Sequence, residues 1–257
     1  MNNLLNATKT WLNQNIQPLQ HFSQASLHIT SLCQLQCIHC PIWQNHIETS
    51  VNIKTIKKLG HKNKTLNIFG GDPFLSPDIF KILVHLKKQN NYIKIWTPGI
   101  TNIGLVETCL PLIDELFLYL PNHEKKSYLE TTGQDRIQIL IETISLLKEN
   151  QKKIYLNHFV DQENIQYLPE IHEFAWQHKL KLVIHYFKNS GLSKESLSYI
   201  KRFKKIKNIQ VFSRKKQPPL SHCPAFPFNA IQNPFQILAN IKDDILNRIQ
   251  SGKIFLF

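Results

Sequence analysis

The sequence predicts an α/β fold, a partial (β/α)6 TIM-like barrel with a short C-terminal appendage. Strand-like and helix-like segments alternate through most of the 257 residues, in about six strand–helix units. The hydrophobic fraction of 42% is enough to build a sizeable core. Because right-handed crossovers curl a parallel sheet in one direction, we expect the sheet to form an open or closed barrel with the helices outside.

The expected elements follow from hydrophobic periodicity, which changes between the strand and helix patterns along the chain. The strands are expected over Ser26–Thr30, Thr65–Phe69, Tyr92–Trp96, Glu115–Leu120, Ile154–Val160 and Leu180–Phe187. The helices are expected over Val51–Leu59, Pro77–Gln89, Leu105–Leu110, Gln134–Glu149, Asn164–His178 and Lys194–Ile206. No internal repeat is visible beyond this alternation.

The alternation divides the chain into three regions. We expect an N-terminal helical segment over residues 1–24, the barrel over 25–216 and the appendage over 217–257, where Pro218-Pro219 interrupts the pattern and Ile237–Ile249 has helical spacing. The polar start does not resemble a secretory signal, and no apolar run is long enough to span a bilayer. These features predict a cytoplasmic protein without a membrane segment.

Three of the five cysteines, Cys33, Cys37 and Cys40, fall within eight residues. A disulfide framework would distribute its cysteines along the chain, so the cluster indicates a metal site. Three thiolates on a cubane iron–sulfur cluster would leave one iron open for a small molecule. The alternative is a zinc site, in which a histidine completes the three cysteines, in a non-catalytic zinc-binding interaction protein; the candidate histidines are His28, His39 and His46.

Two turns follow the second and third expected strands, as the cysteines follow the first. They are Gly70-Gly71-Asp72-Pro73 and Thr97-Pro98-Gly99. Because the C-terminal ends of parallel strands lie at one edge of the sheet, we expect both turns to lie near the cysteines. Glycines allow close approach of the backbone, and a carboxylate accepts hydrogen bonds from an ammonium group.

The Cys-x3-Cys-x2-Cys spacing followed by Gly-Gly-Asp-Pro resembles the radical S-adenosylmethionine (SAM) superfamily, over roughly residues 25 to 190. The resemblance implies that Cys33, Cys37 and Cys40 hold a [4Fe-4S] cluster whose open iron binds SAM. It further implies reductive cleavage of SAM to a 5′-deoxyadenosyl radical, which abstracts hydrogen from a substrate. A one-electron reductant such as flavodoxin or ferredoxin would be a partner.

The same resemblance implies further cofactor-binding residues. His39 would lie near the adenine of SAM, and Asp72 is one methylene shorter than the glutamate usual in the family. Asn157 is a candidate for a contact with the ribose, or else a polar residue at a strand end. The residues implied to bind SAM are His39, Gly70, Gly71, Asp72, Pro73, Thr97 and Asn157.

The substrate stays open between a peptide or protein, an RNA and a small molecule. Cys223 is a candidate hydrogen donor, a remnant of a cysteine-rich extension or a small buried residue, whereas Cys109 belongs to an apolar helix. The formal charge is +13, and a basic stretch covers residues 194–216. That stretch is either a surface for RNA or an acidic partner, or a solvated helix face.

Overall fold

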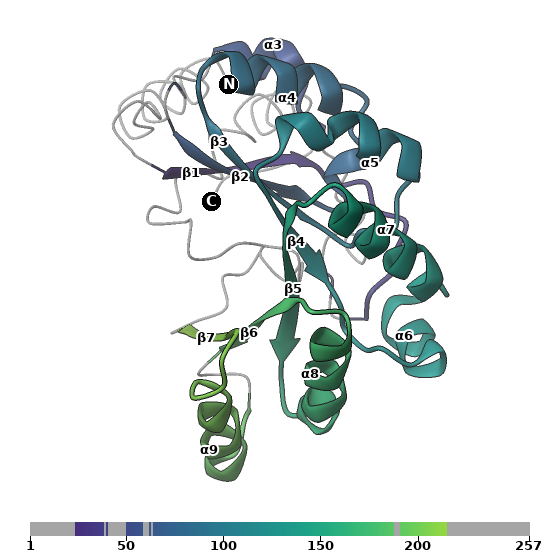
Figure 1. The fold of residues 1–257 in the computed structure, drawn as a ribbon, viewed down its shortest axis with the longest axis vertical. Helices are drawn as coiled ribbons and strands as arrows, with labels where there is room; N and C mark the ends of the chain where they lie inside the picture. Colours follow the sequence, from purple (N-terminus) through teal and green to yellow (C-terminus); the bar gives the residue numbers. More distant parts are fainter. Residues whose placement is uncertain are drawn as a thin grey trace, which may run out of the picture.

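The computed structural model describes residues 24–38, 40, 50–58, 62, 64–187 and 191–214. These residues form a sheet in which every neighbouring pair of strands is parallel and the strand order follows the sequence (Figure 1). The strands are β1 (Gln24–Thr30), β2 (Thr65–Gly70), β3 (Tyr92–Thr97), β4 (Glu115–Tyr119), β5 (Lys153–Val160), β6 (Lys181–Phe187) and β7 (Ile209–Arg214).

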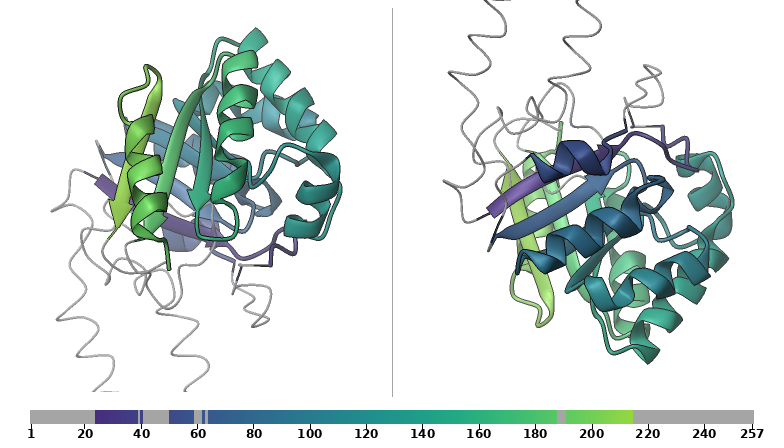
Figure 2. Two further views of the ribbon diagram at one scale, coloured as in Figure 1. Left: turned by 90° about the horizontal axis from the view of Figure 1, so that it is seen from below. Right: turned by 90° about the horizontal axis from the view of Figure 1, so that it is seen from above.

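Helices connect successive strands and cover the outer, convex face of the curved sheet (Figure 2). Buried aliphatic side chains from this face and from the helices form the main core. The α-helices are α3 (Ile53–Lys57), α4 (Ile79–Lys88), α5 (Ile103–Cys109), α6 (Lys125–Thr132), α7 (Ile137–Glu149), α8 (Leu168–Gln177) and α9 (Lys194–Phe203). Short 3-10 helices are η2 (Pro73–Leu75), η3 (Leu110–Leu112) and η4 (Ile165–Tyr167).

The predicted partial barrel is confirmed, and the described sheet is open because β1 and β7 each pair with one neighbour only. The structure adds a seventh strand, β7, within the basic stretch. It also adds α6, which buries only Tyr128 and Thr132 and therefore has little helical periodicity in its sequence. Both additions matter below, because α6 contacts the cysteine loop and the turn before β7 lines a surface groove.

The concave face of the sheet carries large aromatic side chains. Trp96 and Phe117 stack with ring centroids 4.0 Å apart, and Phe117 stacks on Tyr155 at 4.6 Å. On the neighbouring strands, His185 lies between the rings of Phe159 and Phe212, at 4.8 and 5.5 Å. These rings form a wide apolar wall on the inner face of the sheet, whereas the main core on the outer face is mostly aliphatic.

Several sequence predictions lie outside the described residues. They include the roles of His39 and Cys223, the helix over Ile237–Ile249 and most of the N-terminal segment, so the three-region division stays a prediction. Gln24, placed last in that segment, is the first residue of β1. Among the described helices, none has the length and hydropathy needed to cross a membrane.

Candidate active site

The cysteine loop, defined as residues 30–40, begins with the last residue of β1 and is joined to the turn after β2 by backbone hydrogen bonds. The Gly71 N–H donates to the Thr30 carbonyl at 2.8 Å, and the Asp72 N–H donates to the Leu32 carbonyl at 2.6 Å. A Cβ atom at Gly71 would lie 2.6 Å from the Ser31 carbonyl oxygen and nearer still to that of Leu32. The glycine is therefore required by close packing of two backbone segments within the protein, whatever ligand binds there.

The far side of the cysteine loop is joined to the end of α6. The Gln36 and Ile38 N–H groups donate to the carbonyls of Thr132 and Thr131, at 2.7 and 3.0 Å. Gly133 ends the helix with a φ of +70°, a conformation that favours glycine. The loop is thus attached on one side to β2 and on the other to α6, and the sequence pattern indicated only the first attachment.

The three cysteines lie in one loop and are largely removed from solvent. Cys37 is 6% exposed, Cys40 is 9% exposed and Cys33 is partly exposed. Burial raises the pKa of Cys37 to about 12, with a further contribution from Cys40. Burial, followed by the charge of Asp72, also raises the pKa of Cys33. Thiolates in this position therefore need a compensating positive charge, which bound iron would supply.

Three thiolates in one loop are the donor set of a cubane cluster with one iron left open. Among the described residues, which include all three cysteines, no group of three or more His, Cys, Asp or Glu side chains is arranged around a single ion. The Leu35 N–H lies 3.4 Å from the Cys33 sulfur and donates to it, which would stabilise a thiolate.

Asp72 is completely buried and accepts hydrogen bonds from three neighbours. Its Oδ1 accepts from the Phe74 N–H at 3.2 Å and from the Thr97 hydroxyl at 2.9 Å, and its Oδ2 accepts from the Thr101 hydroxyl. Burial raises the pKa of Asp72, and the hydrogen bonds from Thr101, Thr97 and Phe74 oppose that rise. In this structure the carboxylate is engaged by the protein itself.

Two residues that the sequence analysis did not single out complete this network. The Gln34 side-chain amide, inside the cysteine loop, donates to the Thr101 hydroxyl at 2.9 Å. The Thr97 hydroxyl accepts from the Gly99 N–H at 3.0 Å, so it fixes the turn that leads to Thr101. The sequence could have indicated them through Asp72, because a buried carboxylate needs hydrogen-bond donors from neighbouring loops.

The structure brings most of the predicted cofactor-binding residues together at this edge. Gly70, Gly71 and Asp72 contact the cysteine loop or its first residues, Pro73 begins η2, and Thr97 binds Asp72. Asn157 is fully buried on β5, paired in register with Tyr119 of β4, and its carbonyl accepts from the Leu120 N–H at 3.0 Å. The role of Asn157 toward a ribose stays a prediction.

Comparisons with known proteins agree with this geometry. Residues 27–175, more than half of the chain, match the model of the radical SAM superfamily. The structure of SuiB from Streptococcus suis bound to S-adenosylmethionine superposes with a TM-score of 0.61 at 18% identity, covering 82% of this chain and 55% of that one. Native anSMEcpe with bound AdoMet and Cp18Cys peptide gives a TM-score of 0.54 at 14% identity, covering 70% and 57%. No curated protein sequence matches the chain.

A parallel α/β partial barrel with a three-cysteine loop at its C-terminal edge defines the class of enzymes that start radical chemistry from an iron–sulfur cluster. The chain belongs to the radical SAM superfamily. Enzymes of this superfamily use a [4Fe-4S] cluster and S-adenosylmethionine, which decides against the non-catalytic zinc-binding alternative. The chain spans little more than half the length of these two solved relatives.

Proposed function

We propose that Cys33, Cys37 and Cys40 hold a [4Fe-4S] cluster whose open iron binds SAM, and that the chain cleaves SAM reductively. When bound and reduced, the cluster would supply one electron to the sulfonium of SAM, which would break a carbon–sulfur bond to give methionine and a 5′-deoxyadenosyl radical. The observation that carries the proposal is the direct backbone pairing of the cysteine loop with the Gly-Gly-Asp-Pro turn. Two motifs about 30 residues apart thereby become one rigid unit at the C-terminal ends of β1 and β2.

The protein residues around this unit position the loop and exclude water. Gly71 lets the two backbone segments approach, and Asp72 connects the turn after β2 to Thr97 and Thr101 after β3. Gln34 extends the same network into the cysteine loop. Because every member is largely buried or hydrogen-bonded, we infer that Asp72 positions the loop before SAM binds. Any contact between Asp72 and the SAM ammonium would be additional to that role.

The substrate would lie over the concave face, where a radical formed at the C-terminal edge can reach it. Trp96, Phe117 and Tyr155 provide a flat apolar wall there, which would shield a radical from water. SuiB has been solved with the precursor peptide SuiA, and anSMEcpe with the Cp18Cys peptide. A peptide or protein is therefore one candidate substrate, an RNA is another, and flavodoxin or ferredoxin is the candidate electron donor.

The test is anaerobic reconstitution of the full chain with iron and sulfide. We expect about four irons and four sulfides per chain, and formation of 5′-deoxyadenosine from SAM in the presence of dithionite. Asn157 can be examined in the same assay, since Asn157→Ala would weaken SAM binding if it contacts the ribose. A chain that binds no cluster, or a loaded chain that yields no 5′-deoxyadenosine, would contradict the proposal.

A further inference from the structure

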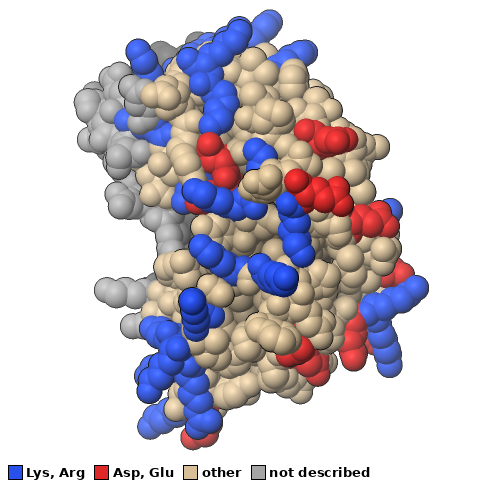
Figure 3. Space-filling view, in the orientation of Figure 1, with Lys and Arg blue, Asp and Glu red and all other residues tan. Residues whose placement is uncertain are grey.

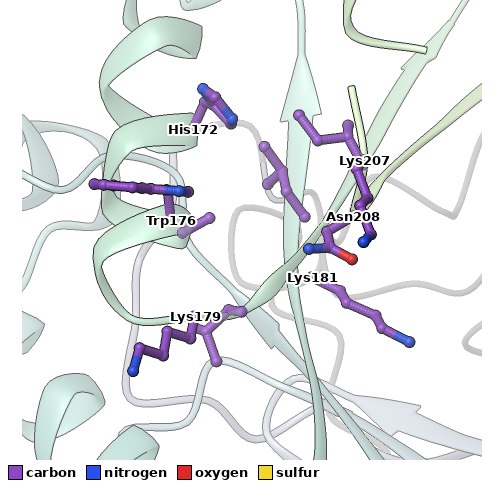
Figure 4. Close-up of a pocket in the computed structure, with 10 residues that line it drawn as sticks. His172, Trp176, Lys179, Lys181, Lys207 and Asn208 are labelled. Carbon is purple, nitrogen blue, oxygen red and sulfur yellow. The ribbon is translucent and has the colours of Figure 1, made fainter. Parts of the chain in front are cut away.

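A groove lies at the edge of the sheet opposite the cysteine loop. It is formed where the helices α7, α8 and α9 turn back into the strands β5, β6 and β7, and two adjoining hollows share Lys179, Leu180 and Lys181. Figure 4 shows one of them, with His172 and Trp176 of α8 on one side and Lys207 and Asn208 on the other. We call the two hollows together the basal groove.

The basal groove is strongly positive. Its lining contains six lysines and no acidic residue: Lys148, Lys152, Lys153, Lys179, Lys181 and Lys207. In the described part of the chain, none of these lysines forms an ion pair with an aspartate or glutamate. In Figure 3, lysine and arginine side chains predominate around the hollowed middle of the displayed face, whereas most acidic side chains lie toward one side.

Two of the six lysines form hydrogen bonds within the protein. Lys152 donates to the Ile113 carbonyl at 3.0 Å, and Lys153 donates to the Tyr92 hydroxyl at 3.3 Å. Lysines near helix C-termini also stabilise the helix dipole, which accounts for Lys148 and Lys179. That reason does not cover Lys181, which is the first residue of β6, or Lys207, which lies four residues after the end of α9. The ammonium group of Lys181 lies 5.6 Å from the centroid of the Tyr155 ring, and both Lys181 and Lys207 are exposed to solvent, where they can meet a ligand.

The rim of the groove carries an exposed aromatic plane. The Trp176 side chain is 70% exposed, the largest exposed fraction among the exposed hydrophobic residues of the described chain. His172 lies one helical turn away on α8 and also lines the hollow. A solvent-exposed indole can stack on an unpaired base, and the ammonium groups beside it can bind the phosphates. These are the two features by which proteins bind single-stranded nucleic acids.

We propose that the basal groove binds a single-stranded nucleic acid, with its phosphates on Lys179, Lys181 and Lys207 and a base stacked on Trp176. Lysine binds phosphate as a point charge, and the exposed indole of Trp176 adds a stacking surface that suits a base better than the side chains of an acidic protein. On the adjoining α9 segment, Lys201, Arg202, Lys204 and Lys205 are exposed and extend the positive surface up to Lys207. The basic stretch thus contributes Lys207 to the groove itself.

The proposal goes beyond SAM cleavage and does not depend on it. The basal groove lies at the N-terminal ends of the strands, and the cysteine loop lies at their C-terminal ends. A nucleic acid bound here could be the substrate only if it were long enough to reach the other edge. Binding can be measured without cluster or SAM, so a failed SAM-cleavage assay leaves this test intact.

The experiment is fluorescence anisotropy of a labelled 12-nucleotide oligouridylate with the full chain, at several salt concentrations. The triple variant Lys179→Gln, Lys181→Gln, Lys207→Gln is expected to bind about tenfold more weakly, with a salt slope reduced by about 2. Its matched control, Lys54→Gln, Lys57→Gln, Lys58→Gln, removes the same charge from the exposed surface around α3 and should bind nearly as well as the unaltered chain. Circular dichroism verifies the fold of both.

Trp176 provides a second, independent variant that leaves the charge unchanged. Trp176→Ala should weaken binding about tenfold, and Trp176→Phe should restore most of it because a phenyl ring also stacks. A labelled oligodeoxyuridylate arm distinguishes RNA from DNA, and labelled polyglutamate tests an acidic polypeptide. Equal losses in the two triple variants, no binding of either oligonucleotide, or preferential binding of polyglutamate would each overturn the proposal.

Discussion

The two edges of the parallel sheet are built in different ways. At the C-terminal edge, segments around residues 34, 72, 97, 101 and 132 converge and are fixed by buried hydrogen bonds. At the N-terminal edge of β5–β7, exposed lysines line an open groove and contact few other side chains. Substitutions at the first edge should therefore disturb folding and the cofactor together, whereas substitutions at the second should change binding alone.

The two edges differ because the polar groups are buried at the C-terminal edge and mostly exposed at the N-terminal edge. Asp72 and Thr97 are at most 1% exposed, and a buried polar group that loses its partner costs about 1–3 kcal/mol. Lys179, Lys181 and Lys207 of the basal groove are exposed, so removing one of them should leave no buried polar group without its partner.

The largest effect is expected from Cys37→Ala, because a cubane left with two protein ligands is not retained. We expect iron content near zero and no 5′-deoxyadenosine after anaerobic reconstitution. The matched control is Cys109→Ala, a cysteine that is fully buried in α5 and far from the loop in the fold. The control should keep its iron and its activity; equal iron loss in both variants would show that the cysteines act through packing.

Gly71→Ala should come next, because its added methyl would overlap the Leu32 carbonyl. We expect a loss of about 3 kcal/mol in the free energy of unfolding, seen as a melting temperature lower by about 10 °C in protein without cluster. Gly104→Ala, inside α5, places its methyl no closer than 3.3 Å to Asn102 and should change stability by less than about 1 kcal/mol. An unaltered melting temperature for Gly71→Ala would contradict the backbone contact.

Thr101→Val keeps the shape of the side chain but removes the hydroxyl between Asp72 and Gln34. The buried carboxylate loses one donor, so stability should fall by about 1–2 kcal/mol, measured by urea unfolding. If the network positions the cysteine loop, cluster content should fall as well, and Thr101→Ser should restore both. A variant that loses stability while it keeps full cluster content would limit the network to a structural role.

The smallest effect concerns pH. Burial lowers the pKa of His28 from 6.5 to about 4 and also lowers the pKa of His158. Between pH 6.5 and about pH 4 the unfolded chain binds protons that the folded chain does not. The free energy of unfolding is therefore highest above about pH 6.5 and falls as the pH is lowered toward 4. In thermal unfolding, His28→Gln should reduce this fall by about 3 °C; an unchanged pH profile would show that His28 titrates normally.

The sequence predicted the six strands, the barrel and the position of the cysteine loop because these depend on local patterns. Periodicity locates β1–β6, and the short spacing of Cys33, Cys37 and Cys40 already implies one loop. The Gly-Gly-Asp-Pro turn was assigned to the same edge because parallel strands place their C-terminal ends together. For Gly71 the assignment was correct but its reason was incomplete, since the close approach found is to the cysteine loop itself.

The parts that escaped prediction depend on contacts between distant segments. The helix α6 buries few residues and is stabilised through its contact with the cysteine loop, which no periodicity reveals. Gln34 and Thr101 lie 67 residues apart and meet only in the folded chain. The strand β7 is rich in polar residues and was absorbed into the basic stretch, although its pairing with β6 covers six residues in register.

The central claim is that the three cysteines hold a cluster with one iron open to SAM. The direct measurement is the electron paramagnetic resonance spectrum of the reconstituted, dithionite-reduced chain before and after SAM is added. We expect a reduced [4Fe-4S] signal whose shape changes with SAM, as the open iron gains a ligand. A signal that stays the same at saturating SAM, or no cluster signal at all, would contradict the account.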